Sequence, residues 1–326
     1  MAPLRICGSC YLIYRYSYQG IMLSLSTQWN QHRHTDGENL LQEIRGLGFP
    51  GVEFGAGMKL SLLPGLKRLA KRGRVKVTSI ENFFPAPLKY REDFDSIFHF
   101  ATTRSADQQK AIQWTLQTID YATEFGAPCV IVQVGRSGMD GYSDSLVQQI
   151  EENQIHSRRF VRDKLAGIER RAQNKGPLLA AVRKAFDQIL PYAEKKGVKI
   201  ALRSPMAYED LPNEIELQEL LQEYAGTPLG YWHDFGAVQV RANLGFLHHL
   251  DWLKSMRDHI YGCHVHDVMW PNHPDRLPLS GMIEFGPLLE ALPSESPLVW
   301  KISPDHRAAD IKQALPPWID QASVAA

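Results

Sequence analysis

The segment Tyr261-Gly-Cys-His-Val-His-Asp267 is a short apolar run that carries two histidines and ends in an aspartate. Alternate side chains of a β-strand point to the same side, so a strand here would direct His264 and His266 together. Asp267 then follows at the point where the strand ends. Such a strand therefore presents two imidazoles and a carboxylate at one end.

Upstream, the segment Pro228 to Ala237 has the same form, because an apolar run ends in His233-Asp234 and a glycine follows. Either His233 or Asp234 is a candidate for the side chain delivered at that strand end. Strands and helices alternate in this way along the chain, and the predicted strands are 21–26, 51–54, 75–80, 129–134, 198–202, 229–232, 260–265 and 298–302. Eight strands separated by helices predict a (β/α)8 barrel.

The barrel accounts for residues 21–326 as one domain, and a chain of 326 residues is of ordinary length for this fold. Residues 1–20 precede the first strand, and we expect them to be an N-terminal extension outside the core. A charged segment over 135–176 predicts a helical insertion after the fourth strand, followed by a helix over 177–196. A doubly wound open sheet is the structural alternative, but no GxGxxG motif follows the first strand.

The composition excludes several classes of partner. Lys plus Arg and Asp plus Glu both number 36, so no overall field attracts nucleic acid or a membrane surface. The basic cluster over 67–76 fits a solvated helix face, and no apolar run is long enough to span a bilayer. Four scattered cysteines give no disulfide framework and favour a cytoplasmic location. Cys7 and Cys10 form a single CxxC motif, which by itself does not predict a metal or redox site.

In a (β/α)8 barrel the carboxyl ends of the strands build the active site. The polar side chains at the predicted strand ends are Glu53, Glu81, Gln133, Arg203, His233 or Asp234, His264 or His266 with Asp267, and Lys301. Each has a structural interpretation when taken alone, and for Glu53 and Gln133 that interpretation is the stronger one. Together they predict a polar site, because titratable groups gather in functional clefts.

Three motifs, taken in order, resemble the sugar phosphate isomerase/epimerase family with its xylose isomerase-like TIM barrel. They are Gly230-Tyr-Trp-His-Asp-Phe-Gly236, Gly262-Cys-His-Val-His-Asp-Val268 and Gly281-Met-Ile-Glu-Phe285. Supporting segments are Gly48-Phe-Pro-Gly-Val-Glu-Phe54, Ser79-Ile-Glu-Asn-Phe-Phe-Pro85 and Ile119-Asp-Tyr-Ala-Thr-Glu-Phe-Gly-Ala127. The resemblance runs from residue 22 to the end of the chain. The motifs are individually loose, but their order is specific.

The resemblance implies a divalent metal held by Glu, Asp, His and Glu from the fifth to the eighth strands, and proton transfer between adjacent sugar carbons. Asp234 matches the sixth-strand ligand, and His266 matches the seventh better than His264 does. Where the family has the two glutamates, this chain has Arg203 and Lys301.

Other family histidines are also replaced, by Glu81, Gln133 and Ala237. Two fixed cations in place of two carboxylates turn attraction for a divalent ion into repulsion of several kcal/mol. We therefore expect no cofactor, with Mn²⁺, Mg²⁺ or Zn²⁺ relevant only if the family site still operates through Asp234 and His266. Ion pairs of Arg203 and Lys301 with Asp234, Glu53 or Glu81 would fill the place of the ion.

Three functions remain open from the sequence. The first is a metal-free isomerase or epimerase acting on a carbohydrate-like molecule, in which Arg203 and Lys301 hold an anionic oxygen and Glu81 or His266 acts as base; Lys301 could instead form a Schiff base. In this function we assign the substrate contacts to Glu53, Gln133, His264 and Asp267.

The second function is an inactive paralogue that binds a ligand or partner. An open polar pocket would favour the enzyme, and closed ion pairs would favour the inactive paralogue. Phosphodiester cleavage, as in the related endonuclease IV barrels, ranks last because it needs more metal ligands than remain. A homo-oligomer is compatible with the resemblance.

Overall fold

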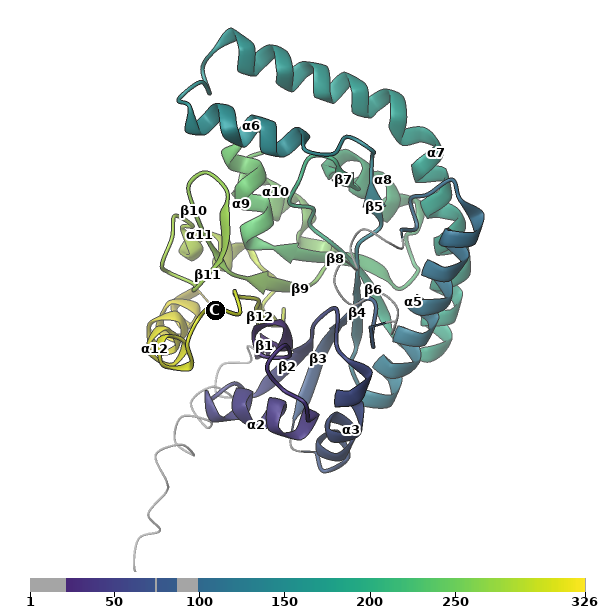
Figure 1. Ribbon diagram of the computed structural model, residues 1–326, viewed down its shortest axis with the longest axis vertical. Coiled ribbons are helices and arrows are strands. Elements are labelled where there is room, and N and C mark those ends of the chain that lie inside the picture. Colours follow the sequence, from purple (N-terminus) through teal and green to yellow (C-terminus); the bar gives the residue numbers. More distant parts are fainter. Residues whose placement is uncertain (1–21, 74, 87–98, 326) are drawn as a thin grey trace, which may run out of the picture.

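The computed structural model describes residues 22–73, 75–86 and 99–325, and its centre is a closed barrel of parallel strands (Figure 1). The barrel strands in chain order are β1 (Leu23–Ser26), β2 (Gly51–Phe54), β3 (Lys76–Glu81), β4 (Cys129–Val132), β6 (Lys199–Arg203), β8 (Leu229–Asp234), β9 (Ile260–Val265) and β12 (Leu298–Trp300). The predicted (β/α)8 barrel is confirmed.

The barrel closes through the first and last strands. β1 pairs in parallel with β2, where Ser24 lies opposite Gly51, and with β12, where Leu23 lies opposite Leu298. All carboxyl ends therefore lie at the same end of the barrel, which is the end that carries active sites in this fold.

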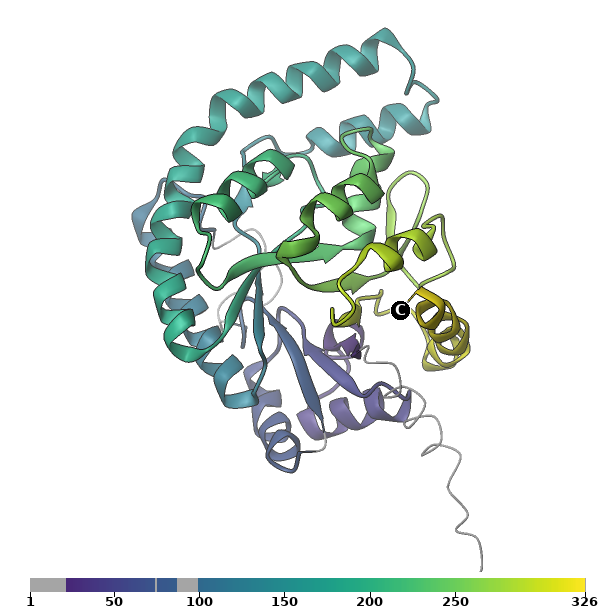
Figure 2. The same cartoon turned by 180° about the vertical axis from the view of Figure 1, so that it is seen from behind.

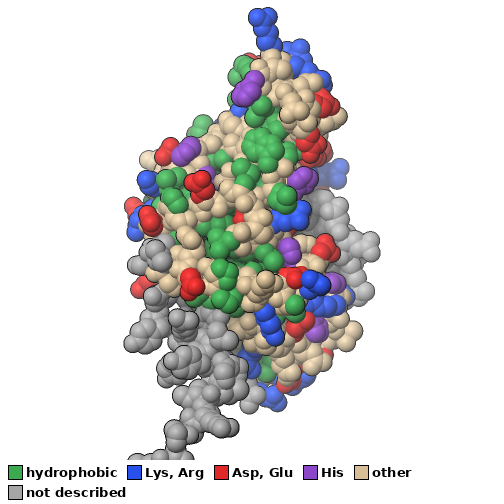
Figure 3. Space-filling model, turned by 90° about the vertical axis from the view of Figure 1, so that its left-hand side faces the viewer, with side chains coloured by type: hydrophobic (Ala, Val, Ile, Leu, Met, Phe, Trp, Pro, Cys, Tyr) green, Lys and Arg blue, Asp and Glu red, His purple; other side chains and the backbone are tan. Residues whose placement is uncertain are grey.

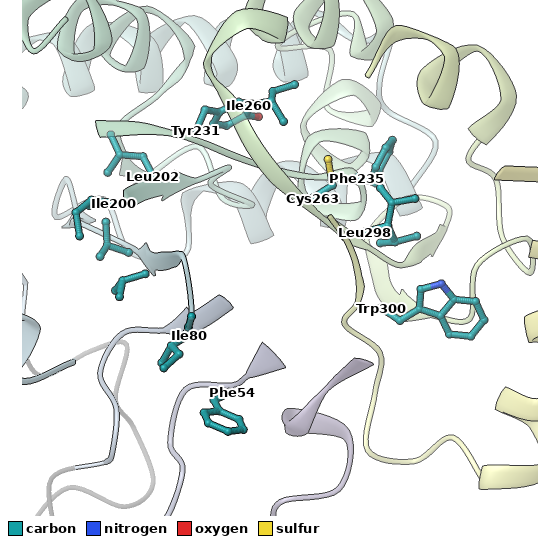
Figure 4. Close-up of a cluster of buried hydrophobic side chains, with 14 of the residues drawn as sticks. Phe54, Ile80, Ile200, Leu202, Tyr231, Phe235, Ile260, Cys263, Leu298 and Trp300 are labelled. Carbon is teal, nitrogen blue, oxygen red and sulfur yellow. The ribbon is translucent and has the colours of Figure 1, made fainter. Parts of the chain in front are cut away.

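In β4, β6, β8 and β12, alternate residues serve two apolar layers. In β4, Cys129 and Ile131 belong to a small buried cluster with Ala201, Trp232 and Val299, which fills the inside of the barrel. Val130 and Val132 belong to the large cluster between the strands and the surrounding helices. Figure 4 shows part of this layer, with Phe54, Ile80, Leu202 and Trp300 among the labelled side chains. Burial on both faces explains why the strands are continuous apolar runs.

Helices surround the barrel in both views (Figures 1 and 2). They are α2 (Gly37–Gly46), α3 (Leu63–Lys71), α5 (Ser105–Phe125), α6 (Tyr142–Glu151), α7 (Arg158–Lys196), α8 (Glu214–Glu223), α9 (Phe235–Asn243), α10 (His249–Met256), α11 (Phe285–Ala291) and α12 (Ala308–Ala325), with 3₁₀ turns at Thr27–Trp29, Leu60–Leu62 and Arg257–His259. The sequence did not predict α9, which starts directly at the end of β8, nor α12, which contains Pro316 and Pro317.

The predicted insertion after the fourth strand is present as α6 and the first half of α7. The expectation of a separate helix beginning at Pro177 is wrong, because α7 is a single helix of 39 residues that passes through Pro177. Figure 1 shows α7 crossing the top of the molecule and then turning down its side. A proline inside a helix lacks one hydrogen bond and is a usual cause of such bending.

Two small antiparallel sheets lie outside the barrel: β5 (Gly135–Arg136) with β7 (Asp210–Leu211), and β10 (Asp267–Met269) with β11 (His273–Arg276). The basic cluster on α3 forms ion pairs with acidic side chains, as Arg68 and Arg72 do with Glu38. Within the described part of the chain, no helix is long and apolar enough to cross a membrane. The proposed extension, 1–20, and its Cys7 and Cys10 lie outside the described residues.

Candidate functional site

A cavity of about 190 Å³ opens at the carboxyl ends of the barrel strands. Its polar lining includes Glu81, Gln133, Arg203, Asp234, His266 and Lys301. These six side chains come from the ends of β3, β4, β6, β8, β9 and β12, so the barrel gathers residues that are far apart in sequence. All six were predicted as site residues, and the structure brings them together at one mouth.

Glu81 is the centre of the charge network. Its Oε1 accepts hydrogen bonds from Lys301 Nζ at 2.5 Å and from Arg203 Nη1 at 3.1 Å, and its Oε2 accepts one from the backbone N–H of Ala56. Burial raises the pKa of this carboxyl, but the charges of Lys301, His264 and Arg203 outweigh burial and lower the pKa to about 2. Glu81 is therefore a stable anion in the absence of a ligand.

Arg203 links Glu81 to two further cavity residues. The Gln133 amide faces the guanidinium, and in the orientation that satisfies both groups its oxygen accepts from Arg203 Nε at 3.0 Å. The same Nε lies 4.0 Å from Asp234 Oδ2. The ion pairs expected for Arg203 and Lys301 are thus present, with Glu81 as the shared partner.

Asp234 ends β8 and caps α9. Its Oδ1 accepts from the backbone N–H of Ala237 at 3.0 Å and from His266 Nε2 at 2.7 Å, while Oδ2 lies 3.5 Å from His264 Nδ1. Burial raises the pKa of Asp234, but His266 and His264 more than compensate and hold the pKa well below its ordinary value. The capping role fixes this carboxylate at the cavity wall.

The imidazole of His266 is held in one orientation. Its Nδ1 accepts the backbone N–H of Asp275 at 2.9 Å, so Nε2 carries the hydrogen that is donated to Asp234. Asp275 adopts a left-handed backbone conformation with φ of 59°. Gly236 packs on the ring so closely that a Cβ there would lie 2.0 Å from His266 Cε1. Both ring nitrogens are thus engaged.

Glu53 and His264 lie deeper, below the cavity. Both are fully buried, and Glu53 Oε2 accepts from Ser79 Oγ at 2.7 Å and pairs with His264 Nε2 at 2.9 Å. Burial lowers the pKa of His264, but the charge of Glu53 and the contacts with Asp234 and Glu53 together raise it more, so the net shift is upward. Among the described residues, Glu53 Oε1 has no hydrogen-bond partner, whereas His264 Nδ1 faces Asp234 Oδ2 at 3.5 Å.

Two other candidates face away from the cavity. Asp267 uses both oxygens on backbone N–H groups, with Oδ1 accepting from Val268 and Ile283 and Oδ2 accepting from Gly281. Its carboxylate therefore secures the loop that follows β11. His233, the alternative to Asp234, bonds to Tyr231 and His249 in the helix layer, and burial lowers its pKa to about 3.

Sequence reasoning missed several lining residues, namely Gln28, Ala56, Asn82, Met206 and Asp275. Asn82 directly follows Glu81, so its position at a strand end was the available signal. Asp275 comes from the β10–β11 hairpin, and its place beside His266 depends on how that hairpin folds back over the barrel. No local pattern marks such a return.

The closed parallel barrel with a polar mouth defines a (β/α)8 protein with a strand-end site. A family profile for the xylose isomerase-like TIM barrel matches residues 41–316. The chain belongs to this family. Comparison of the sequence with curated proteins gives no significant match.

Solved structures with the same fold include a D-tagatose 3-epimerase-like protein, with 17% identity, a TM-score of 0.63, and coverage of 93% of this chain and 98% of that chain. The 3-keto-D-glucoside 4-epimerase YcjR from E. coli has 14% identity, a TM-score of 0.65, and coverage of 92% and 99%. The IOLI protein with a bound zinc atom has 13% identity, a TM-score of 0.61, and coverage of 94% and 96%.

The residues at the family's metal positions fit a divalent ion poorly. Arg203 and Lys301 occupy the positions that the resemblance assigns to metal-binding carboxylates, and Asp234 already accepts two hydrogen bonds on one oxygen. A second group, Glu53, Glu81 and His264, brings three ligand atoms within 4.8 Å of one another. Lys301 and Arg203 already neutralise Glu81 there, so an added ion would meet two cations at short range.

Proposed function

We propose that this chain binds a small carbohydrate-like molecule at the mouth of the barrel and recognises it through fixed charges in place of a divalent ion. The observation that carries the proposal is the pairing of both Lys301 and Arg203 with Glu81 Oε1 beside an open cavity. The three cited structures include two whose names describe sugar epimerases or relatives of them, which supports a ligand of this class.

Ligand binding without turnover fits the resting geometry best. A general base works best with a pKa near the ambient pH, and Glu81 has a pKa of about 2. His266, the other proposed base, has both ring nitrogens in hydrogen bonds. Polar ligand groups would instead meet Gln133, Asn82 and Gln28 on the cavity wall.

A second candidate function is metal-independent proton transfer of the isomerase or epimerase type. It is favoured by the position of Lys301 and His266 on the wall of the same cavity. A ligand oxygen that drew Lys301 and Arg203 away from Glu81 would remove the charges that lower its pKa, and Glu81 would become a stronger base only with ligand bound. Glu81 would then take the proton from carbon while the two cations hold the enolate oxygen.

The deciding experiment combines binding with isotope exchange. Titration calorimetry with ketoses, aldoses and their phosphates, in EDTA, should find at least one ligand that binds the wild type. Lys301→Ala should weaken this ligand at least about ten-fold, and Lys312→Ala, at an exposed position of α12, should not.

Deuterium exchange from D₂O into the bound ligand would identify proton transfer, and its absence would favour binding alone. Loss of all binding in EDTA, with recovery on adding Mn²⁺, would overturn recognition by fixed charges.

The cytoplasmic location remains a prediction from the cysteine content.

A further inference from the structure

The first half of α7 carries an exposed apolar seam. Val161, Leu165 and Ile168 are 51%, 55% and 37% exposed, and Ala172 is also exposed. The steps between these four residues are four, three and four, which is the spacing of alternating a and d positions in a coiled coil. A helix that packed only on its own chain would carry polar residues on this outer face.

The other faces of this helical arm are already used. Toward α6, Gly167 packs so closely on Tyr142 that a Cβ would lie 2.1 Å from the ring. Toward the barrel, Lys164 donates to the carbonyl of Leu244 at 2.9 Å and caps the end of α9. The seam of Val161, Leu165, Ile168 and Ala172 therefore points away from both neighbours. In Figure 3 the upper end of the molecule, where α7 lies in Figure 1, also carries basic side chains.

The arm is fixed at its base by a buried ion pair. Arg171 and Glu216 are 1% and 0% exposed, and Arg171 Nη2 lies 2.7 Å from Glu216 Oε2. Arg171 also donates to the backbone carbonyl of Asp210 at 2.8 Å. These contacts hold the seam in one orientation relative to the barrel, so a partner would meet a preorganised surface.

We propose that the seam docks on the same seam of a second copy of this chain, with the two arms antiparallel and the two-fold axis at Leu165. A two-fold interface must be complementary to itself. Val161 lies four residues before Leu165, and Ile168 lies three residues after it. In the antiparallel pair, Val161 of each arm therefore packs beside Ile168 of the other arm. Leu165 meets its own copy.

The flanking charges agree with this arrangement. Arg162 is 73% exposed, pairs with Asp163 of its own helix, and follows Val161 at the seam's outer edge. Glu169 is exposed and follows Ile168 at the same edge. In the antiparallel pair, Arg162 of one arm lies next to Glu169 of the other, and the contact occurs twice. Such edge charges set partner choice and orientation in coiled coils. The seam is shorter than a standard interface, so the dimer forms reversibly with concentration.

Sedimentation velocity of the full chain over a wide concentration range tests the dimer. The wild type should shift from monomer to twice that mass, and Leu165→Glu should weaken the dimer at least about ten-fold. Gln173→Glu, at an exposed position outside the seam on the same helix, should leave it unchanged. A wild type that stays monomeric throughout, or a dimer unaffected by Leu165→Glu, would overturn the proposal.

Charge reversal and cross-linking test the antiparallel register. Arg162→Glu and Glu169→Arg should each weaken the dimer, and the double variant should restore it because each contact is simply reversed. Leu165→Cys should give an intermolecular disulfide under mild oxidant, and Gln173→Cys should not. Weakening that the double variant fails to reverse, or equal cross-linking at both positions, would exclude this register.

Discussion

Lys301 Nζ lies 2.5 Å from Oε1 of Glu81, although the two residues belong to strand ends that are separated in the barrel by β1 and β2. Arg203, at the end of β6, reaches the same oxygen. One buried carboxylate thus joins three parts of the barrel mouth. The charges at the centre of the cavity are largely balanced by this arrangement, and its consequences can be measured.

The Glu81 carboxylate should make folding stability depend on acid pH. Its folded pKa is about 2, below the ordinary value of 4.5, so its contribution is full above pH 4.5 and is lost as the pH falls through 2. The shift corresponds to about 3 kcal/mol. Urea unfolding from pH 7 to pH 2 should show a flatter pH dependence for Glu81→Gln. The exposed-site variant Glu290→Gln should match the wild type, and equal slopes in all three proteins would contradict the shift.

Gly236→Ala should displace His266, because the new Cβ would lie 2.0 Å from a buried ring atom. We expect a loss of about 2 kcal/mol in the free energy of unfolding together with weaker ligand binding, since the bond from His266 to Asp234 must shift. Gly46→Ala is the matched control, because a Cβ there meets nothing within 4 Å. Thermal unfolding and calorimetry measure both effects, and an unchanged Gly236→Ala protein would contradict the packing.

Asp267→Asn should lower stability and leave ligand affinity unchanged. An amide nitrogen would face one of the three backbone N–H groups that the carboxylate now accepts, at a cost of about 2 kcal/mol. Urea unfolding reports the stability, and calorimetry reports the affinity. The reverse result, lost affinity with unchanged stability, would restore Asp267 as a substrate contact.

The double variant Arg203→Glu/Lys301→Glu should gain metal binding. It replaces both cations by carboxylates beside Asp234 and His266, and added Mn²⁺ should raise its Tm because binding to the folded state alone stabilises it. Adding Asp234→Ala should remove this effect. The wild type should show no change in Tm with Mn²⁺, Mg²⁺, Zn²⁺ or EDTA. One equivalent of metal in the wild type, lost on Asp234→Ala, would contradict the proposed metal independence.

The elements that sequence reasoning predicted well are those whose pattern follows from local burial. The apolar runs at Cys129 and Ile260 mark β4 and β9 because both faces of a barrel strand are covered. The missed helix α9 follows β8 without a polar loop, since Asp234 both ends the strand and caps the helix. The helix α12 was hidden by Pro316 and Pro317, which usually indicate a break.

Within the candidate site, the sequence predicted which residues gather but not how deep each one lies. Glu81, the last residue of its strand, reaches the cavity, whereas Glu53, one residue before the end of β2, is fully buried beside His264. Glu53 pairs with Ser79, so Glu81 lies two residues further toward the mouth on the same inner side of the barrel. That difference depends on the stagger between neighbouring strands, which a single strand's sequence does not carry.

The sequence by itself determined the barrel and the set of polar groups at its mouth, because strand periodicity and parallel connections are local properties. Tertiary structure alone decided that Lys301 and Arg203 share Glu81, that His266 has no free ring nitrogen, and that Asp267 holds a loop. These contacts join residues from distant parts of the chain. Their partners are selected by distance and by the need to neutralise buried charge once the barrel has closed.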